Sequence, residues 1–334
     1  MRGGNGMMIL VTGGAGRMGR RLCAGLALRG DTVRILCLPG DPAVAVLGGA
    51  GFDFAFGDVT RKESLAAALH GVDIVFHLAA VLLAPGHEEV FQAVNADGTR
   101  NLAEAAEAAG VSQFIYVSSI SVMYPKSNAY ARSKLRGETW VKSSRLKSFT
   151  IVRPSLAYQD GGAEEFMRFV DHLKRGPLVF LPGGGRARKS PVHVDDLAAA
   201  FLALPGNPKA HGKTYLLTGG ETLTLRQMAQ ALLAHMGRPK PILGIPNWLC
   251  LMGVAILSAW SRISGSKNPF TLQTYTGLIQ DAAPEEDLAR LDLGYHPRNF
   301  RQGLETLVSL RDCLRAGGGR RVADKVADTG IPAS

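Results

Sequence analysis

The chain has 334 residues, of which 46% are hydrophobic and 20% charged, so it can bury a large core and is not disordered over most of its length. Its length fits one large α/β domain or, as we favour, a nucleotide-binding domain with a smaller companion. The net charge of +10 attracts anions, but the basic residues are spread out without interleaved aromatic side chains, so we expect no nucleic-acid partner.

The first half of the chain alternates short apolar segments with segments of helical periodicity. Apolar segments without polar alternation are typical of strands that are buried on both faces of a sheet. The expected strands are residues 8–11, 32–38, 53–56, 74–78, 113–117 and 150–153, and the expected helices are 20–29, 62–69, 88–109 and 128–145. This order predicts an α/β fold with a doubly wound parallel sheet.

After Pro154 the regular alternation ends. We expect helices at 163–174, from 195 onward, and at 224–236, 248–262 and 300–314, with strands at 191–194 and 214–218. The second half is therefore mostly helical.

A glycine-rich turn, TGGAGRMG, follows the first strand and opens the first helix. Gly13 permits a tight turn, Gly16 permits close approach of a pyrophosphate, and Gly19 lets the helix lie close to the strand. Free N–H groups and the helix dipole at this point favour an anion. The turn therefore predicts a dinucleotide site.

Tyr130 and Lys134 are one helical turn apart on the helix expected at 128–145, so their side chains are neighbours. An adjacent ammonium favours the phenolate form of a tyrosine and brings proton exchange toward neutral pH. Ser119, at the end of the preceding strand, is placed to hydrogen-bond a substrate oxygen. Ser118 or Ser121 would take that position if the register differed. The three predicted catalytic residues are Ser119, Tyr130 and Lys134.

These motifs, in this order, resemble the extended branch of the short-chain dehydrogenase/reductase superfamily, which includes the NAD-dependent epimerases and dehydratases. Further matching segments are Gly57-Asp58-Val59, His77-Leu78-Ala79-Ala80, Asn95 with Gly98-Thr99, Ser118-Ser119, Arg153-Pro154, Val192 to Asp196, and Leu293-Gly294-Tyr295. The resemblance spans about residues 8 to 310 and implies an NAD(P)-dependent oxidoreductase. The loop from Ser119 to Tyr130 is shorter than in most relatives, so the site is either more open or covered by the second lobe.

The resemblance also implies which residues bind the cofactor. They are Gly13, Gly16, Arg17, Met18, Gly19, Asp58, Val59, Leu78, Ala79, Ala80, Asn95, Lys134 and Pro154. In the family the lysine binds the nicotinamide ribose and Asn95 supports it through ordered water, although a purely structural role for Asn95 stays open.

The second strand ends at Cys37 and Leu38, where relatives usually carry Asp or Arg, so this position selects neither NAD nor NADP. Arg17, Arg34 or Arg61 could supply a charge for a 2′-phosphate. We therefore favour NADP, with NAD as the alternative.

The same resemblance suggests a domain division. Residues 7–154 and 191–219 form a dinucleotide-binding Rossmann domain, residues 155–190 and 220–315 a substrate-binding lobe, and residues 316–334 a flexible basic tail. Family members often dimerise through the helices expected at 88–109 and 128–145, which makes a homodimer an expectation here too.

The segment 241–261 is uncharged and the most apolar part of the chain. It is interpreted as a buried helix of the second lobe, as a wall of the substrate pocket, or as a peripheral membrane contact. Lys189 stands near the position where relatives that act on nucleotide sugars carry an arginine. We expect a lipophilic alcohol or ketone as substrate, with a nucleotide-sugar epimerase or dehydratase as the alternative and a non-catalytic dinucleotide-binding subunit as the third.

Four cysteines, Cys23, Cys37, Cys250 and Cys313, are scattered without metal-binding spacing. Together with the lack of a leader-like segment before the first strand, this predicts a cytoplasmic protein without a metal site, peripheral membrane association being left open.

Overall fold

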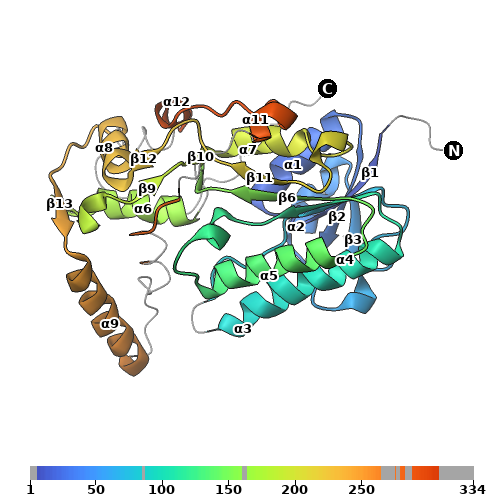
Figure 1. Ribbon diagram of the computed structural model, residues 1–334, viewed down its shortest axis with the longest axis horizontal. Helices are drawn as coiled ribbons and strands as arrows, with labels where there is room; N and C mark the ends of the chain where they lie inside the picture. The colour runs from blue at the N-terminus through green and yellow to red at the C-terminus, as the bar shows by residue number, and fades with distance from the viewer. Residues whose placement is uncertain are drawn as a thin grey trace.

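The computed structural model of the chain describes residues 6–84, 87–159, 164–264, 275, 279–282 and 288–307. Its centre is a parallel sheet of seven strands in the order β11-β6-β5-β4-β1-β2-β3 (Figure 1). The strands are β1 (Met8–Thr12), β2 (Thr32–Cys37), β3 (Asp53–Phe56), β4 (Ile74–His77), β5 (Gln113–Val117), β6 (Phe149–Pro154) and β11 (Thr214–Leu217). The expected doubly wound parallel sheet is confirmed.

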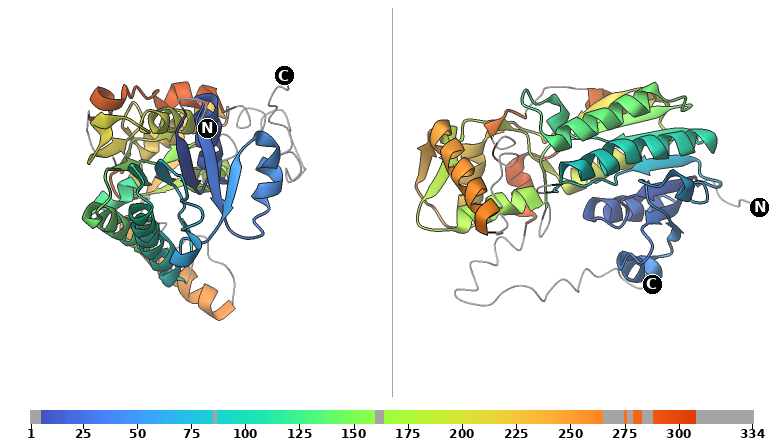
Figure 2. Two further views of the ribbon diagram at one scale, coloured as in Figure 1. Left: turned by 90° about the vertical axis from the view of Figure 1, so that its right-hand side faces the viewer. Right: turned by 90° about the horizontal axis from the view of Figure 1, so that it is seen from below.

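Helices cover both faces of this sheet (Figure 2). On one face lie α1 (Arg17–Leu28) and α7 (Val194–Leu202), and on the other lie α4 (Gly98–Ala108) and α5 (Ala129–Ser143). Successive residues of β1 contribute to different cores: Ile9 and Val11 pack with the α1 side, whereas Leu10 packs with the α4 side. Because strand side chains alternate between faces, a strand covered on both sides has to be apolar throughout.

The helix expected at 88–109 forms with an irregularity in its middle. It consists of α3 (Glu88–Phe91), a π-helical turn (Gln92–Asp97) and α4, and Asn95 on the π-helical turn is completely buried. Such turns are rare and frequent at functional sites.

The prediction of a helix at 62–69 is wrong. Only a 3₁₀ turn, Lys62–Ser64, forms there. The Ser64 hydroxyl donates to the carbonyl of Arg61 and accepts from the N–H of Asp58, so this side chain holds the backbone in a turn instead of a helix. Leu65 and Leu69 are nevertheless buried against the sheet.

A second hydrophobic cluster lies beyond the carboxyl ends of the central strands. It is built from α6 (Glu164–Lys174), α8 (Leu225–His235), α12 (Phe300–Glu305) and β8 (Val179–Pro182). Short strand pairs join this region: β7 (Ala157–Tyr158) with β10 (Val192–His193), β9 (Arg188–Lys189) with β12 (Leu223–Thr224), and β8 with β13 (Ile242–Ile245). Of these strands only β10 was expected, at 191–194. The domain boundaries stay a prediction, and the basic tail lies outside the described residues.

The apolar segment 241–261 forms β13 and most of α9 (Asn247–Ser264), which projects away from the rest of the molecule (Figure 1). The interpretation as a buried helix is wrong, because most of its large side chains are exposed, including Trp248 at 61% and Trp260 at 66%. Within the described ranges, no helix combines the length and hydropathy needed to cross a bilayer.

Candidate active site

The glycine-rich turn joins β1 to α1 with the backbone tightly folded. Gly13 has a φ of +70°, and a Cβ at this residue would lie 2.8 Å from the N atom of Ala79. At Gly19 a Cβ would lie 2.2 Å from the carbonyl oxygen of Gly13, so only glycine lets the helix pack against the turn. Both glycines are required by the fold itself.

Gly16 differs from the other two glycines because it is exposed and its surroundings are open. A Cβ there would meet only the carbonyl oxygen of Gly13, at 3.2 Å. Gly16 is the N-cap of α1 and offers no side chain to the first N–H groups of the helix. Uncapped N–H groups beside an open surface suit a phosphate group, so the turn fits the pyrophosphate of a dinucleotide.

The arginines named for a 2′-phosphate are placed differently. Arg17 begins α1 and is exposed. Arg34 is not available for this role, because its guanidinium contacts Asp53 at 2.6 Å and the carbonyl oxygens of Ala68 and His70. Arg61, like Arg17, is exposed and remains a candidate.

The other predicted cofactor residues line the same edge of the sheet or lie just behind it. The Asp58 carboxylate accepts a hydrogen bond from the N–H of Thr60, while Val59 is buried. Half-buried residues at this edge are Met18, Leu78, Ala79, Ala80 and Pro154, the last residue of β6.

A chain of buried polar groups runs behind this edge. His77 Nδ1 lies 2.6 Å from the Thr12 hydroxyl, and His77 Nε2 lies 3.0 Å from the Thr99 hydroxyl. Burial, reinforced by the charge of Lys134, lowers the pKa of His77 to about 3, so the ring is neutral and links the two hydroxyls. Thr99 in turn donates to the carbonyl of Asn95.

Asn95 forms hydrogen bonds both to the segment that follows β4 and to α5. Its carboxamide accepts from the N–H of Val81 at 2.8 Å and donates to the carbonyl of Val81 at 2.9 Å. It also donates to the Ser133 hydroxyl at 3.1 Å. These contacts favour the structural alternative for Asn95.

The helix α5 presents Tyr130 and Lys134 to the ends of β4 and β5. It begins at the N-cap Asn128, whose side chain accepts a hydrogen bond from the N–H of Ala131. Tyr130 is half-buried, with its ring 6.2 Å from that of Phe91. Lys134 is 1% exposed.

Lys134 Nζ lies 4.3 Å from the centre of the Tyr116 ring. Burial lowers the pKa of Lys134 to about 7, although the negative charge of Glu138 opposes that decrease. Tyr116 also lies close enough to Tyr130 for the two to interact electrostatically. The ammonium named from sequence thus lies over the buried Tyr116 ring, and the phenol of Tyr130 lies one helical turn before Lys134 on α5.

The three candidate serines have different surroundings. The Ser118 hydroxyl is buried and donates to Glu138 Oε1 at 2.6 Å. Ser119 is half-buried, and its hydroxyl lies 3.0 Å from that of Ser121. This arrangement favours Ser119 or Ser121 over Ser118 as the residue that faces a substrate.

Sequence patterns did not identify Glu138 and Tyr116 as parts of the site, and they gave Arg153 only as part of the matching segment Arg153-Pro154. Glu138 is 1% exposed and receives two hydrogen bonds from Arg153, at 2.8 and 2.6 Å. Burial would raise the pKa of Glu138, but the hydrogen bonds from Arg153 and Ser118 and nearby positive charges lower it. A signal was present, because residues 130, 134 and 138 share one helix face.

The short loop between Ser119 and Tyr130 contacts the second half of the chain. Lys126 and Gln280 exchange two hydrogen bonds through the Lys126 backbone, at 2.7 and 3.0 Å. Lys189 donates to the carbonyl of Gln280 at 2.6 Å and lies over the ring of Tyr124. The loop is therefore tied to the second half of the chain, while Met123 and Lys126 within it stay exposed, so the choice between an open and a covered site stays a prediction.

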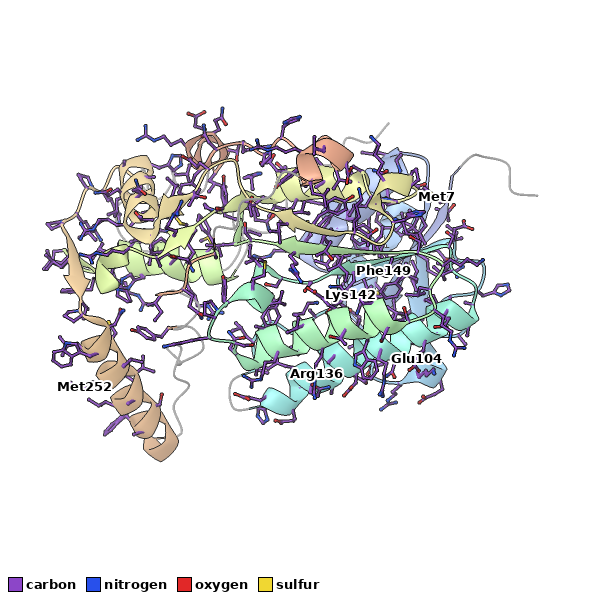
Figure 3. The ribbon with its side chains drawn as sticks, in the orientation of Figure 1. Met7, Glu104, Arg136, Lys142, Phe149 and Met252 are labelled. Atoms are coloured by element: carbon purple, nitrogen blue, oxygen red, sulfur yellow. The ribbon has the colours of Figure 1, made fainter. Side chains whose placement is uncertain are left out.

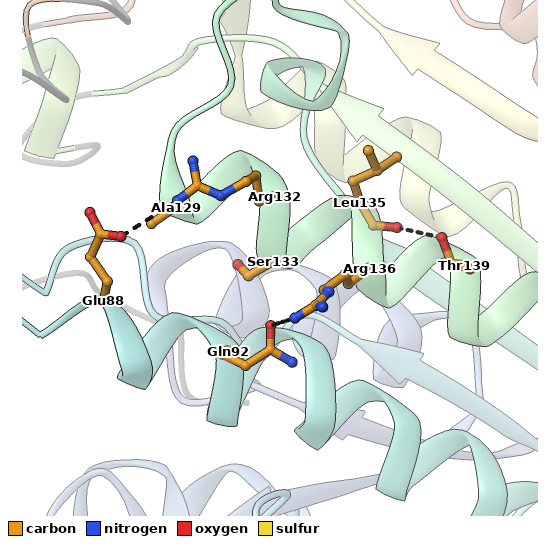
Figure 4. A pocket seen from close by; sticks show the side chains of 8 residues that line it. All are labelled: Glu88, Gln92, Ala129, Arg132, Ser133, Leu135, Arg136 and Thr139. Carbon is orange, nitrogen blue, oxygen red and sulfur yellow. Dashed lines mark hydrogen bonds and ion pairs between the residues drawn. The ribbon is translucent and has the colours of Figure 1, made fainter.

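A hollow of about 490 Å³ lies elsewhere, on the outer face of α3 and α5 (Figure 4). Arg132 contacts Glu88 and Arg136 contacts Gln92 across it. It lies on the helix pair for which a dimer contact is expected from the sequence, and its lining does not include Tyr130 or Lys134.

The glycine turn and the helix with Tyr130 and Lys134 both lie within the stretch 9–217, which matches the family described as NAD dependent epimerase/dehydratase. The chain belongs to this family. The expected short-chain dehydrogenase/reductase is thereby confirmed, as is its dependence on NAD at family level.

Proteins similar to this member of the NAD dependent epimerase/dehydratase family include named reductases. The 2-alkyl-3-oxoalkanoate reductase of Stenotrophomonas maltophilia is 30% identical, over 90% of this chain and 98% of its own. The 3 beta-hydroxysteroid dehydrogenase/Delta 5-->4-isomerase of Mycobacterium tuberculosis is 28% identical, over 92% and 89%. The crystal structure of gox2253 superposes with a TM-score of 0.73 at 26% identity, over 92% and 98%.

Proposed function

We propose that this chain transfers a hydride between a nicotinamide cofactor and the hydroxyl or ketone carbon of a lipophilic substrate, with Tyr130 as general acid or base. The observation that carries the proposal is the position of Lys134, 1% exposed and one turn from half-buried Tyr130. An ammonium is costly to bury, so a lysine buried beside a tyrosine suggests a use for its charge, and a pKa of about 7 leaves part of Lys134 protonated at neutral pH.

Each catalytic side chain has a separate part in this proposal. Bound NAD(P) supplies or accepts the hydride. The Tyr130 hydroxyl gives a proton to the substrate oxygen during reduction and removes it during oxidation. The Lys134 ammonium favours the phenolate form of Tyr130, and the Ser119 hydroxyl donates to the substrate oxygen and orients it.

The cofactor would be held by the turn of Gly13, Gly16 and Gly19. Arg17 is exposed at the start of α1, beside this turn, and would supply the positive charge that a 2′-phosphate requires. We therefore keep NADP as the favoured cofactor and NAD as the alternative.

Two observations support a lipophilic substrate. The named relatives act on 3-oxoalkanoates and 3 beta-hydroxysteroids. Large apolar side chains are also exposed where the chain leaves β4 and β5: Leu82 at 59%, Leu83 at 40% and Met123 at 47%. Exposed apolar groups in the segments that follow these two strands suit a substrate with a hydrocarbon body.

A nucleotide-sugar epimerase or dehydratase is the second candidate, because the family includes such enzymes. It would need a cation for the diphosphate, and Lys189, near the expected position, is 5% exposed and donates to the Gln280 carbonyl. Because Lys189 is buried and bonded to Gln280, it is not available for a diphosphate, which favours a ketone or alcohol substrate over a nucleotide sugar.

The test is titration with NADPH and NADH, followed by turnover on long-chain 3-oxo compounds, steroid ketones and nucleotide sugars. Tyr130→Phe should keep cofactor affinity and lose about a hundredfold or more in kcat. Tyr215→Phe is the matched control, because its hydroxyl bonds Asp292 at the far edge of the sheet. Equal turnover in wild type and Tyr130→Phe would refute the proton-transfer role.

Other outcomes select the alternatives. Turnover of nucleotide sugars alone would show that the substrate is a nucleotide sugar and not a lipophilic ketone or alcohol. Tight cofactor binding without turnover of any compound in the panel would favour a non-catalytic subunit.

A further inference from the structure

The helix α9 carries a stripe of large apolar side chains that the described part of the chain leaves uncovered. Trp248, Met252, Ile256 and Trp260 follow one another at four-residue intervals and are 61%, 50%, 65% and 66% exposed. Residues at this spacing share one face of a helix. Met252 points outward, away from the body of the molecule (Figure 3).

The other face of α9 is attached to the protein. Val254 is 5% exposed, Cys250 is half-buried, and the Tyr275 hydroxyl donates to the carbonyl of Asn247 at 3.2 Å. Positions 247, 250 and 254 lie on the side of the helix opposite the stripe, so the contacts of α9 with the protein leave the stripe free.

The strand pair that leads into α9 also carries exposed apolar side chains. Phe180 of β8 and Leu243 of β13 are register partners and are 44% and 45% exposed. We call α9 together with these two side chains the apolar arm. Single exposed apolar residues are ordinary, but a contiguous group of this kind marks an interaction surface.

The stretch of sequence that contains β13 and α9 is basic. Residues 222–280 contain no aspartate or glutamate, and they contain five basic residues, namely Arg226, Arg238, Lys240, Arg262 and Lys267. A basic region next to an apolar surface is complementary to anionic lipid headgroups. Tryptophan side chains also favour the boundary between headgroups and acyl chains.

We propose that the apolar arm binds the surface of an anionic lipid bilayer, with α9 lying in the headgroup region and its exposed stripe turned toward the acyl chains. None of the described helices qualifies as a membrane span, so the arm would lie on the bilayer without crossing it. The proposal does not depend on which reaction the enzyme catalyses.

The test is flotation of the full chain with vesicles of phosphatidylcholine alone and of phosphatidylcholine with phosphatidylglycerol. Wild type should float with the anionic vesicles and less at high salt. Ile256→Glu should lower the bound fraction about tenfold, because it puts a charge into the stripe. Leu28→Glu is the matched control, since Leu28 is 91% exposed on α1, and it should float like wild type.

Tryptophan fluorescence gives an independent readout. The chain has three tryptophans, and Trp140→Phe leaves only Trp248 and Trp260 on α9. Anionic vesicles should shift the emission of this variant to the blue, and lipids brominated near the headgroup should quench it.

Two results would overturn the proposal. One is no flotation of a folded wild type with either vesicle. The other is flotation that Ile256→Glu leaves unchanged. A wild-type dimer that Ile256→Glu converts to a monomer, without any lipid binding, would instead assign the stripe to a contact between two copies of the chain.

Discussion

Glu138 lies one helical turn after Lys134 on the inner face of α5, and each of these two oppositely charged side chains is only 1% exposed. Arg153 and Ser118 hold the carboxylate in place. Its charge counteracts the burial that lowers the pKa of Lys134 to about 7. We therefore expect Glu138 to keep more of Lys134 protonated.

Glu138→Gln should shift the pH dependence of turnover. Without the negative charge the pKa of Lys134 falls further below about 7, and the protonated form, present only below the pKa, is lost at lower pH. The alkaline limb of kcat/KM against pH should therefore move to lower pH, with a loss of about tenfold at pH 8.

The control is Lys142→Ala, because Lys142 is 47% exposed and 3.7 Å from the same carboxylate. It should leave the profile in place. An unchanged alkaline limb in folded Glu138→Gln would show that Glu138 does not tune Lys134.

Ser118 and Ser119 should respond differently to removal of their hydroxyls. Ser118→Ala leaves Glu138 without a buried hydrogen bond and should cost about 2 kcal/mol of unfolding free energy. Ser119→Ala removes the acceptor for the N–H and hydroxyl of Ser121 and should cost about 1 kcal/mol, while it lowers kcat about tenfold to a hundredfold. Urea unfolding and steady-state kinetics measure both, and a turnover loss confined to Ser121→Ala would move the role to Ser121.

Substitutions of Gly16 and Gly19 should have different effects, the first on cofactor affinity and the second on stability. Gly16 has φ −70° and ψ 166°, which alanine adopts readily, so Gly16→Ala should fold normally and weaken NAD(P)H binding about tenfold or more. Gly19→Ala places a Cβ against the Gly13 carbonyl and should cost about 3 kcal/mol or more of stability. Undiminished cofactor affinity in Gly16→Ala would remove this turn from the phosphate site.

Arg17→Ala should weaken NADPH binding about tenfold and leave NADH binding nearly unchanged, because only NADPH carries the extra phosphate. Fluorescence titration with the two cofactors gives the ratio of affinities. Arg61→Ala, prepared in parallel, shows whether that arginine contributes. A ratio that stays the same in Arg17→Ala would exclude Arg17 from this contact.

The sheet could be predicted because its strands are apolar on both faces. The proximity of Tyr130 and Lys134 could be predicted because helix periodicity alone makes them neighbours. Hydrogen bonds between a side chain and the nearby backbone are hard to predict from sequence. The apolar spacing at 62–69 therefore predicts a helix where the Ser64 hydroxyl forms a turn. The place of Arg34 depends on Asp53 in a neighbouring strand, which no local pattern reveals. Hydropathy likewise could not distinguish an apolar helix inside the protein from one that projects, as α9 does.

The sheet receives its outer strand late in the chain. The chain leaves the sheet after Pro154, builds part of the second cluster, and returns with β11 pairing along β6, Thr214 opposite Ile151 and Leu217 opposite Pro154. During synthesis β6 therefore emerges from the ribosome with one edge bare until residue 217 has followed. A fragment that stops at Pro154 would keep that row of unpaired N–H and C=O groups, and is for this reason unsuited to separate expression.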